Sequence, residues 1–501
     1  MKKSTATPIF KTATIVTLLS VLERLLGFFY RITLSNKLGE ESLGVYQAAT
    51  SLFGVFLTIG VGGLPMTVSR FIARSRAEKS EKNEQRSVSA GLFLALLLGL
   101  LPATAFWLFG RLFTPLLPDE RCLPVLNILL IGSVFAAAFA VLRGQMWGNK
   151  KFLAPTLFEL LEESALVIAG VFFLYLDGEM PLIERAAWAN TLSYALSFSV
   201  AFLCFFLDKN KLSSPLPLAK PLFQAALPIT TIRLMSSLLV SAVALLLPAM
   251  LVKAGSTQSD AIKTYGILTG MVIPVLFIPS TLVGSISLVL SPQLSEDYYK
   301  KNQQNLKRNI ARGLLAAALL AGLLAPAVFV LGEEAGKILF SSQIAGEMIK
   351  NGSPMLLPMS LSMISTTVLN SLGFQKQTLR YYFVGALALT ASILILPRYL
   401  GGYAYLVGMG LNFTLTTLCN LLFLKNKKLL PSRLIRKLLL IAAFVLPISL
   451  FGQFVKSLCV VFLGEFWACV TVGVSLCGFA VGLYCLYFRK KGQKNTIRQE
   501  K

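Results

Sequence analysis

The chain has 501 residues, of which 55% are hydrophobic and only 14% are charged, and its mean hydropathy is +0.70. A soluble protein of this length would form several domains and would need more charge to cover them, so that class is excluded. The net charge of +24 suggests a nucleic-acid partner, but the basic residues are spread over short loops instead of one patch. We therefore expect an integral membrane protein that contacts membrane lipids and binds no nucleic acid.

Apolar segments long enough to cross a bilayer follow one another almost from end to end. We expect an all-α protein with fourteen transmembrane helices. The first six are predicted at residues 8–34, 43–68, 87–109, 123–144, 156–176 and 186–207. The next six are predicted at residues 221–251, 261–290, 310–331, 354–372, 381–396 and 401–424, and the last two at residues 438–454 and 459–488.

The distribution of basic residues predicts the orientation of these helices, because short cytoplasmic loops retain Lys and Arg. With both termini in the cytoplasm, 34 of the 47 basic residues lie in inside segments and ten lie in outside segments. The first apolar run follows lysines, as in a signal peptide, but it is long and contains Arg24 and Arg31. We therefore expect a retained helix.

The chain also has a predicted domain organisation. Residues 208–220 are polar and proline-rich, and we expect them to be a cytoplasmic linker between two six-helix lobes at residues 1–207 and 221–424. Residues 425–501 would hold the last two helices and a basic cytoplasmic tail. Residues 333–349 mix apolar and polar positions at helical spacing, which predicts a segment on the outer surface.

Three basic residues lie inside predicted helices and are not explained by topology. Arg24 and Arg31 are seven residues apart, close to two turns, so we expect them on one face of the first helix. Gly27 lies between them and leaves room beside the guanidinium groups. A charge inside the bilayer is costly and a guanidinium fork suits phosphate oxygens, so both are candidates for anion binding in an aqueous cavity. Arg233, in the seventh helix, is a third candidate.

The alternative is that these arginines only pair with acidic groups on neighbouring helices. Glu159, Glu162 and Glu163 stand at the cytoplasmic start of the fifth helix, where carboxylates also favour a helix N-terminus. Glu163 is the deepest and the best internal partner. Glu23 points about 100° away from Arg24, so it is not that residue's natural partner. Glu23 and Glu163 are both candidate charge partners or ion sites.

Catalytic and cofactor motifs are missing from the sequence. There is no histidine, the seven cysteines show no paired metal spacing, and no "GxxxxGK" loop occurs. We expect no metal, no cofactor and no ATP hydrolysis, and we assign no catalytic residues.

Several short motifs resemble those of a known family. They are "LGFFYRI", "LGEESLGVYQ", "GVGGLPMTVSRFIA", "LRGQMWGNKKFLAPTLFELLEE", "LPAMLVKAGSTQSDAIKTYG" and "IPSTLVGSISLVLSPQLSE". By their order and spacing, over roughly the first twelve helices, the chain resembles the stage V sporulation protein B family of polysaccharide biosynthesis proteins. That family lies in the multidrug/oligosaccharidyl-lipid/polysaccharide exporter (MOP) superfamily, which includes lipid II and O-antigen flippases.

The resemblance implies a MATE-like inverted-V bundle of two six-helix lobes that alternates between inward-open and outward-open states. Its members move lipid-linked sugars, commonly on undecaprenyl pyrophosphate, for cell-wall or spore-cortex assembly. Arg24 and Arg31 match basic positions that engage the pyrophosphate in flippase relatives. Arg143, which precedes a matching glycine, is a further substrate-binding candidate, and Glu163 matches a family glutamate.

The glycines and prolines of these motifs are expected packing or hinge positions. With Gly27, they are Gly62, Gly63, Pro65, Gly144 and Pro155. The chain also departs from the family pattern, because Ser164 and Val167 stand where Gln and Arg are usual. The aspartate expected in the seventh helix, near Leu247 and Pro248, is missing.

The leading hypothesis is a monomeric flippase, not an enzyme, for an undecaprenyl-pyrophosphate-linked oligosaccharide or peptidoglycan precursor in the bacterial cytoplasmic membrane. One alternative is a cation-coupled multidrug antiporter of the same superfamily, which would need acidic cavity residues. Another is a membrane glycosyl polymerase or ligase, which would need large external loops. The sugar carried, a role in sporulation and the energy source stay open.

Overall fold

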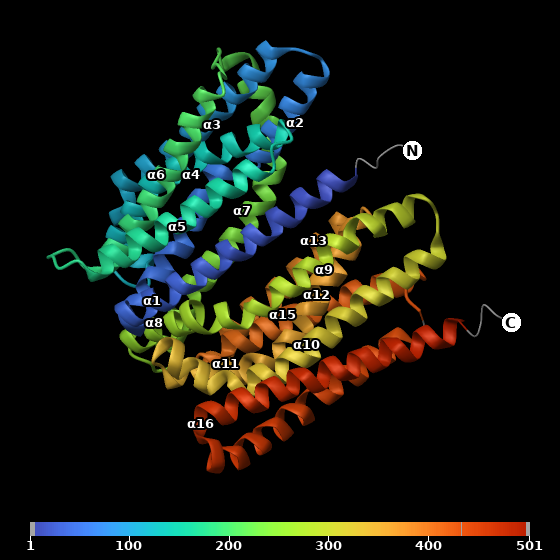
Figure 1. Ribbon diagram of the computed structural model, residues 1–501. Coiled ribbons are helices and arrows are strands. Elements are labelled where there is room, and N and C mark those ends of the chain that lie inside the picture. The colour runs from blue at the N-terminus through green and yellow to red at the C-terminus, as the bar shows by residue number, and fades with distance from the viewer. Residues whose placement is uncertain (1–5, 432, 497–501) are drawn as a thin grey trace. The chain divides into compact units, whose positions relative to one another are not determined.

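The computed structural model describes residues 6–431 and 433–496 (Figure 1). Every regular element within those ranges is a helix, which confirms the all-α prediction. Ten helices there are long and apolar enough to cross a membrane, so the chain is a multi-pass membrane protein. The count of fourteen spans stays a prediction, because Ile15–Ala77 forms one segment by this measure although the sequence predicts two helices in it.

The chain folds into two compact units. The first holds the described residues up to Val252 together with Ser256–Gly266. The second holds Lys253–Gly255 and the described residues from Ile267 onward. The seventh predicted helix thus packs with the first six. The predicted lobes and the linker at residues 208–220 divide the chain by helix number and loop composition, which packing units need not follow, so that division stays a prediction.

The helices of the first unit begin and end at recognisable signals. At the start of α3, for example, the Ser80 hydroxyl accepts a hydrogen bond from the backbone N–H of Asn83 at 3.4 Å, and Glu81 and Glu84 occupy the first turn. The elements are α1 (Ala6–Val61), α2 (Leu64–Ala77), α3 (Glu81–Phe109), the 3-10 helix η1 (Gly110–Leu116), α4 (Cys122–Gly148), α5 (Leu153–Tyr175), α6 (Leu182–Leu207), α7 (Leu216–Lys253) and α8 (Gln258–Gly266).

Glycines divide the first helical stretch differently from the prediction. α1 is two helices joined at Gly39, whose backbone (φ 71°, ψ 171°) is a conformation that glycine adopts readily. The second of these helices ends at Val61, because Gly62 (φ 23°) and Gly63 precede the start of α2. The predicted end of the second helix at residue 68 is therefore wrong, and residues 64–68 belong to α2.

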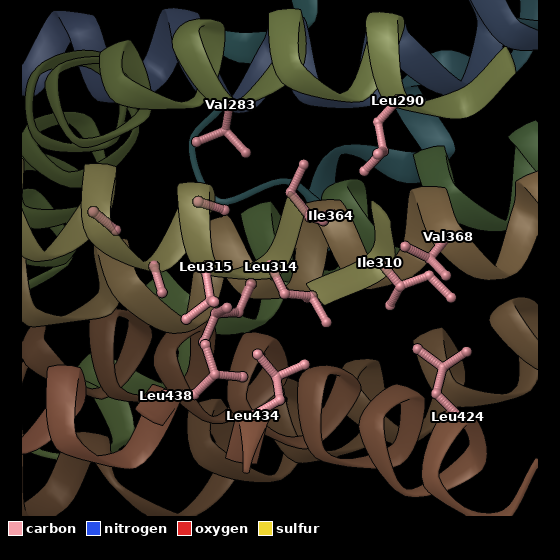
Figure 2. Close-up of a cluster of buried hydrophobic side chains, with 14 of the residues drawn as sticks. Val283, Leu290, Ile310, Leu314, Leu315, Ile364, Val368, Leu424, Leu434 and Leu438 are labelled. Atoms are coloured by element: carbon pink, nitrogen blue, oxygen red, sulfur yellow. The ribbon is translucent and has the colours of Figure 1, made fainter. Parts of the chain in front are cut away.

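The second unit packs its helices around a buried aliphatic core (Figure 2). Side chains from five helices meet there, among them Val283 and Leu290 of α9, Leu314 of α10, Ile364 of α12 and Leu424 of α15. The elements are the π-helix η2 (Ile267–Val272), α9 (Ile273–Tyr299), α10 (Gln303–Phe340), α11 (Gln343–Gly352), η3 (Ser353–Met355), α12 (Leu356–Ser371), α13 (Gln375–Ile395), α14 (Pro397–Leu400), α15 (Tyr403–Asn426) and α16 (Leu434–Thr496).

Two helical reversals in this unit depend on glycine. The segment predicted at residues 333–349 is split, because α10 runs on to Phe340 and α11 folds back against it, with Gly336 directly on the backbone of Gly346. In α16, a Cβ on Gly452 would lie 2.8 Å from Cδ1 of Leu476. A straight helix would hold these two residues about 36 Å apart, so α16 folds back on itself between them.

Candidate functional site

Two arginines stand on the first helix of α1, in the sequence "LERLLGFFYRI". Arg24 and Arg31 are both exposed, and their seven-residue spacing puts them on one side of the helix, about 10 Å apart along its axis. Neither forms an ion pair with a carboxylate in the described part of the chain. A charge deep in a bilayer costs at least about 2.5 kcal/mol, so we expect guanidinium groups on a membrane-spanning helix to face water or an anion, or to reach the membrane surface.

A glutamate from α5 lies against α1 at Gly27, on the side of the helix that carries Arg24 and Arg31. A Cβ on Gly27 would collide with Oε1 of Glu163 and lie 3.3 Å from its Cδ. The carboxylate therefore rests on the bare backbone of α1, where it interacts electrostatically with Arg31 and with Glu23. The structure thus brings Gly27 and Glu163 together on the arginine face; their role in binding a ligand stays a prediction.

A second close contact between α1 and α5 also involves a glycine. A Cβ on Gly170 of α5 would fall on the ring of Tyr30 of α1, so each helix offers a glycine to a large side chain of the other. Tyr30 is 4% exposed, and its hydroxyl has no hydrogen-bond partner among the described residues. This reciprocal contact fixes the distance between α1 and α5, and with it the position of Glu163.

The remaining predicted charges form a neighbouring group. Nη1 of Arg143 is 2.6 Å from Oε1 of Glu159, and both side chains are only about a quarter exposed, at 22% and 27%. The Arg143 guanidinium also lies 5.2 Å from the ring centroid of Trp147. Glu23 interacts electrostatically with Glu159, Arg24 and Arg143, so it links this group to the arginine face. Arg143 is thus paired with Glu159 through Nη1, and its role in substrate binding stays a prediction.

Arg233 has a different position from the other candidate arginines. Its Nη1 donates to the carbonyl of Gly62 at 3.0 Å, and the neighbouring Thr230 hydroxyl accepts the N–H of Gly63 at 2.9 Å. Both α7 side chains thus bind the break between α1 and α2. Arg233 satisfies a carbonyl at a helix end, which a basic side chain does well, and the structure does not bring it to Arg24 or Arg31.

The other predicted packing positions lie at close helix contacts or inside the bundle. A Cβ on Gly144 of α4 would collide with the carbonyl oxygen of Pro65 and lie 2.9 Å from its Cα, so α4 and α2 touch there through their backbones. Pro155 is buried in the first turn of α5. A hinge role for any of these residues stays a prediction.

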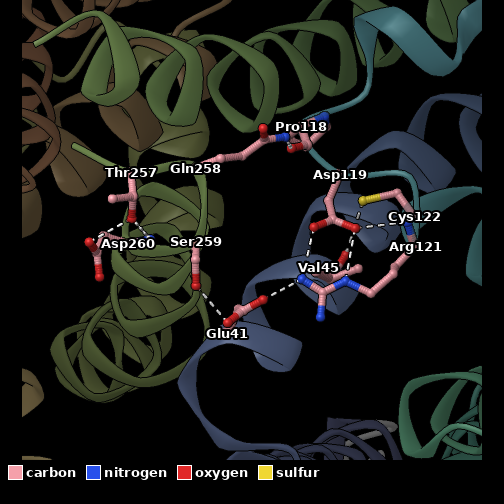
Figure 3. Close-up of polar contacts among 10 residues, drawn as sticks. All are labelled: Glu41, Val45, Pro118, Asp119, Arg121, Cys122, Thr257, Gln258, Ser259 and Asp260. Atoms are coloured by element: carbon pink, nitrogen blue, oxygen red, sulfur yellow. Dashed lines mark hydrogen bonds and ion pairs between the residues drawn. The ribbon is translucent and has the colours of Figure 1, made fainter. Parts of the chain in front are cut away.

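Sequence reasoning missed a polar cluster formed by α1, α8 and the loop before α4 (Figure 3). Arg121 pairs with Glu41 and holds Asp119 through Nε and Nη2 at 2.9 and 2.8 Å. The Ser259 hydroxyl donates to Oε2 of Glu41 at 2.7 Å. Burial by itself would raise the pKa of Asp119, but the hydrogen bonds from Arg121 lower it overall. Arg121 served only as a loop charge in the topology count, and no local pattern indicated its partners.

Solved structures identify the fold. The lipid II flippase MurJ in an inward closed conformation matches with a TM-score of 0.72 at 15% identity, over 94% of this chain and 98% of that chain. An inward-facing multidrug resistance MATE family transporter of the MOP superfamily gives 0.67 at 16% identity, over 83% and 96%. The fold is that of the MOP-superfamily transporters.

Sequence comparison narrows this class to one family. Stage V sporulation protein B of Bacillus subtilis (strain 168) is 24% identical over 390 residues, which is 75% of either chain. Residues 9–297, more than half of the chain, match the model of the polysaccharide biosynthesis protein family. The chain belongs to the polysaccharide biosynthesis protein family, as its motifs predict.

Proposed function

We propose that this protein is a flippase that moves an undecaprenyl-pyrophosphate-linked oligosaccharide or peptidoglycan precursor across the bacterial cytoplasmic membrane. The observation that carries the proposal is the arrangement of Arg24 and Arg31 on one exposed face of α1, with the Glu163 carboxylate resting on Gly27, where it interacts electrostatically with Arg31. A pyrophosphate has several anionic oxygens, and guanidinium groups bind such oxygens through paired, charge-assisted hydrogen bonds.

The Glu163 carboxylate lowers the positive charge of the site when no ligand is bound. Without ligand, its carboxylate compensates part of the charge of Arg31. An arriving pyrophosphate replaces that compensation, and the site then needs no external counter-ion. Two arginines and two glutamates, Glu23 and Glu163, meet here, so voltage coupling requires that the empty site keep a net positive charge, which would respond to the membrane potential by about 2.3 kcal/mol per charge per 100 mV. An inside-negative potential would return the empty site toward the cytoplasm without a proton relay.

Topology and assembly complete the proposal. We propose fourteen spans with both termini in the cytoplasm, two six-helix lobes at residues 1–207 and 221–424, alternating access between them, and a working monomer. The support is the loop charge distribution, in which inside segments hold 34 of the 47 basic residues. The protein would then act as a transporter and not as an enzyme.

A cation-coupled drug antiporter is the second candidate. It is favoured by the likeness to a multidrug resistance transporter and by the proximity of Glu23 and Glu163 on α1 and α5. The two functions differ in the sign of their substrate: an antiporter would carry an organic cation, for which the exposed Arg24 and Arg31 are unfavourable neighbours.

The deciding experiment is leaflet-specific flipping of one defined lipid-linked sugar by purified protein in vesicles with a clamped membrane potential. Arg24→Ala and Arg31→Ala should each lower the initial rate about 10- to 100-fold, since each removes hydrogen bonds from a charged group. Arg74→Ala is the matched control, because Arg74 is an exposed arginine paired with Glu78 at 2.8 Å, on α2. Unchanged rates in both test variants, or export of cationic dyes instead, would exclude the flippase.

A further inference from the structure

An apolar cavity of about 680 Å³ lies within the first unit. Its walls come from α1, α3, η1, α4 and α7, and they include Leu52 of α1, Leu126 of α4 and Leu245 of α7. Every described residue that lines it is apolar. The volume is within the range of roughly 300–1,000 Å³ that is typical of ligand pockets. Because the lining side chains offer no hydrogen bonds, the part of a ligand that enters this cavity is a hydrocarbon.

Three phenylalanine rings form one wall of the cavity. Phe56 of α1 lies edge-on to Phe106 of α3, with ring centroids 5.4 Å apart. Phe106 is stacked in turn on Phe113 of η1, with centroids 6.3 Å apart. A Cβ on Gly110 would lie 3.1 Å from Cε1 of Phe106, so the chain passes closely over that ring as α3 ends and η1 begins. This tight passage brings Phe113 onto the cavity wall.

The cavity extends along α3 and opens toward lipid. Its α3 lining runs from Pro102 to Phe109, which is about 10 Å along the helix axis. Phe109, Leu112 and Phe113 line the end nearest η1 and are exposed. Exposed apolar side chains on a membrane-spanning segment face lipid chains. A lipid chain can therefore reach the cavity from the bilayer without crossing water.

A single arginine stands at the same end. Arg111 lies in the chain between the lining residues Phe109 and Leu112, and it is exposed. It forms no ion pair with a carboxylate in the described part of the chain. Nearby on α3, the exposed Trp107 donates its indole N–H to the carbonyl of Asn127 at 3.3 Å. Tryptophan is typical of the membrane–water interface, so Arg111 is expected at the level of the lipid headgroups.

We propose that this cavity binds an anionic phospholipid, with one acyl chain inside the cavity and the phosphate on Arg111. The order of the site along α3, a cation followed by an apolar channel, is the order of headgroup and chain in a lipid. An empty apolar cavity forfeits dispersion contacts, which an acyl chain restores. One guanidinium suits the single charge of a phospholipid phosphate, whereas the pyrophosphate site proposed above uses Arg24 and Arg31. In the proposed topology the segment between α3 and α4 is outside, which assigns the lipid to the outer leaflet.

The test is photolabelling of the purified full-length protein in phosphatidylcholine vesicles. The probe is phosphatidylglycerol with a diazirine in one acyl chain, and the labelled peptides are identified by mass spectrometry. Label should be concentrated within residues 102–126. A phosphatidylcholine probe with the same chain should label this segment about fivefold less, because it carries no net charge for Arg111 to attract. Equal labelling by the two probes, or label spread evenly over all exposed helix faces, would overturn the site.

Arg111→Gln tests the headgroup contact. It should lower labelling by phosphatidylglycerol about fivefold and leave labelling by phosphatidylcholine unchanged. Arg398→Gln is the matched control, because Arg398 is also exposed, also lacks an ion pair in the described part of the chain, and is also outside in the proposed topology. Full labelling of the Arg111→Gln variant by phosphatidylglycerol would refute the contact with the phosphate.

Ala105→Trp tests the cavity itself. Ala105 lines the cavity, so an indole there should reduce labelling by both probes. Leu108→Trp is the control, because Leu108 is an exposed residue of α3 that does not line the cavity. Undiminished labelling of a folded Ala105→Trp variant would refute chain binding in this cavity. Arg111→Gln alters only an exposed side chain, so the proposal can be refuted even if Ala105→Trp does not fold.

The isoprenoid tail of a lipid-linked sugar is the competing occupant. Unlabelled undecaprenyl pyrophosphate should displace the phosphatidylglycerol probe no better than unlabelled phosphatidylglycerol does. Displacement at a tenfold lower concentration would assign the cavity to the isoprenoid tail and overturn the phospholipid. These measurements follow binding and not transport, so a failure of the proposed flipping activity would leave their outcome unchanged.

Discussion

Two glycines in the first unit allow a sharp prediction, because the same substitution meets a different obstacle at each. At Gly144, a new Cβ would strike the backbone of Pro65, including its carbonyl oxygen and its Cα at 2.9 Å. At Gly27, it would strike only the carboxylate end of Glu163, with Cδ at 3.3 Å. A backbone held by two helices cannot move aside, whereas a glutamate side chain can rotate.

The expected magnitudes follow from this difference. Overpacking against fixed atoms costs about 1–3 kcal/mol, and replacing a helical glycine by alanine returns about 0.5–1 kcal/mol. Gly144→Ala should therefore lose about 1–2 kcal/mol of stability, which lowers the unfolding temperature by about 2–8 °C. Gly27→Ala should keep the parent unfolding temperature within about 2 °C while it pushes Glu163 off the arginine face. It should then reduce flipping without reducing stability.

The assay is thermal unfolding of the purified variants in one detergent at one heating rate, because membrane-protein unfolding is commonly irreversible. Flipping is measured on the same preparations. The reasoning would be refuted if Gly144→Ala were as stable as the parent, or if Gly27→Ala were destabilised as much as Gly144→Ala. Normal flipping by a stable Gly27→Ala variant would show that the position of Glu163 does not matter for transport.

Three further predictions concern other contacts. Arg143→Ala should destabilise the first unit by about 1–3 kcal/mol, because it leaves Glu159 unpaired. Adding Glu159→Gln to that variant should restore part of the lost stability, measured by thermal unfolding. Strictly additive effects of the two substitutions would contradict this coupling. Leu314→Ala should lower the stability of the second unit by about 2–5 kcal/mol, because Leu314 lies in its buried core. The substitution should speed amide hydrogen exchange in the second unit but not in α5 of the first unit. Equal effects on exchange in the two units would argue against separate units. Hydrogen bonds from Arg121 lower the pKa of Asp119, so the contribution of Asp119 to holding Arg121 in the polar cluster is present above about pH 4 and is lost as the pH falls through the lowered pKa. Glu41 is a second carboxylate in the cluster and binds Ser259 of α8 directly, so amide exchange of α8, corrected for its intrinsic rate, should depend less on pH in Asp119→Asn but keep the part due to Glu41; an unchanged pH dependence would contradict the role of Asp119.

Local features of the sequence were sufficient to predict the membrane class, most helix positions and the face that carries the two arginines. The all-α membrane class and the approximate positions of most helices come from hydrophobic runs, which report burial in lipid directly. The shared face of Arg24, Gly27 and Arg31 comes from helical periodicity alone. Glu163 was chosen as the deepest acidic residue of its helix, and the structure places its carboxylate on that face.

Other features depend on contacts between distant segments and could not be read locally. The break at Gly39 needs a positive φ, and many other glycines of this chain sit in ordinary helix. The sequence predicted only that Arg233 is an intramembrane charge. Its acceptor is the carbonyl of Gly62, at the helix break, which is far away in sequence, so no local pattern could show this partner. Arg121 likewise meets Glu41 only because α1 and α4 are packed together.

The glycine exchange between α1 and α5 also has a consequence for biosynthesis. Gly27 and Glu163 are separated by about 140 residues, so at roughly 5–20 residues per second α5 leaves the ribosome about 7–30 seconds after α1. During that interval Arg31 is in or near the bilayer without the carboxylate that later compensates it. The nascent first helix should therefore be retained at the insertion machinery until α5 arrives. Variants that remove Glu163 should prolong that retention and be degraded more readily during synthesis, even where the finished protein is stable.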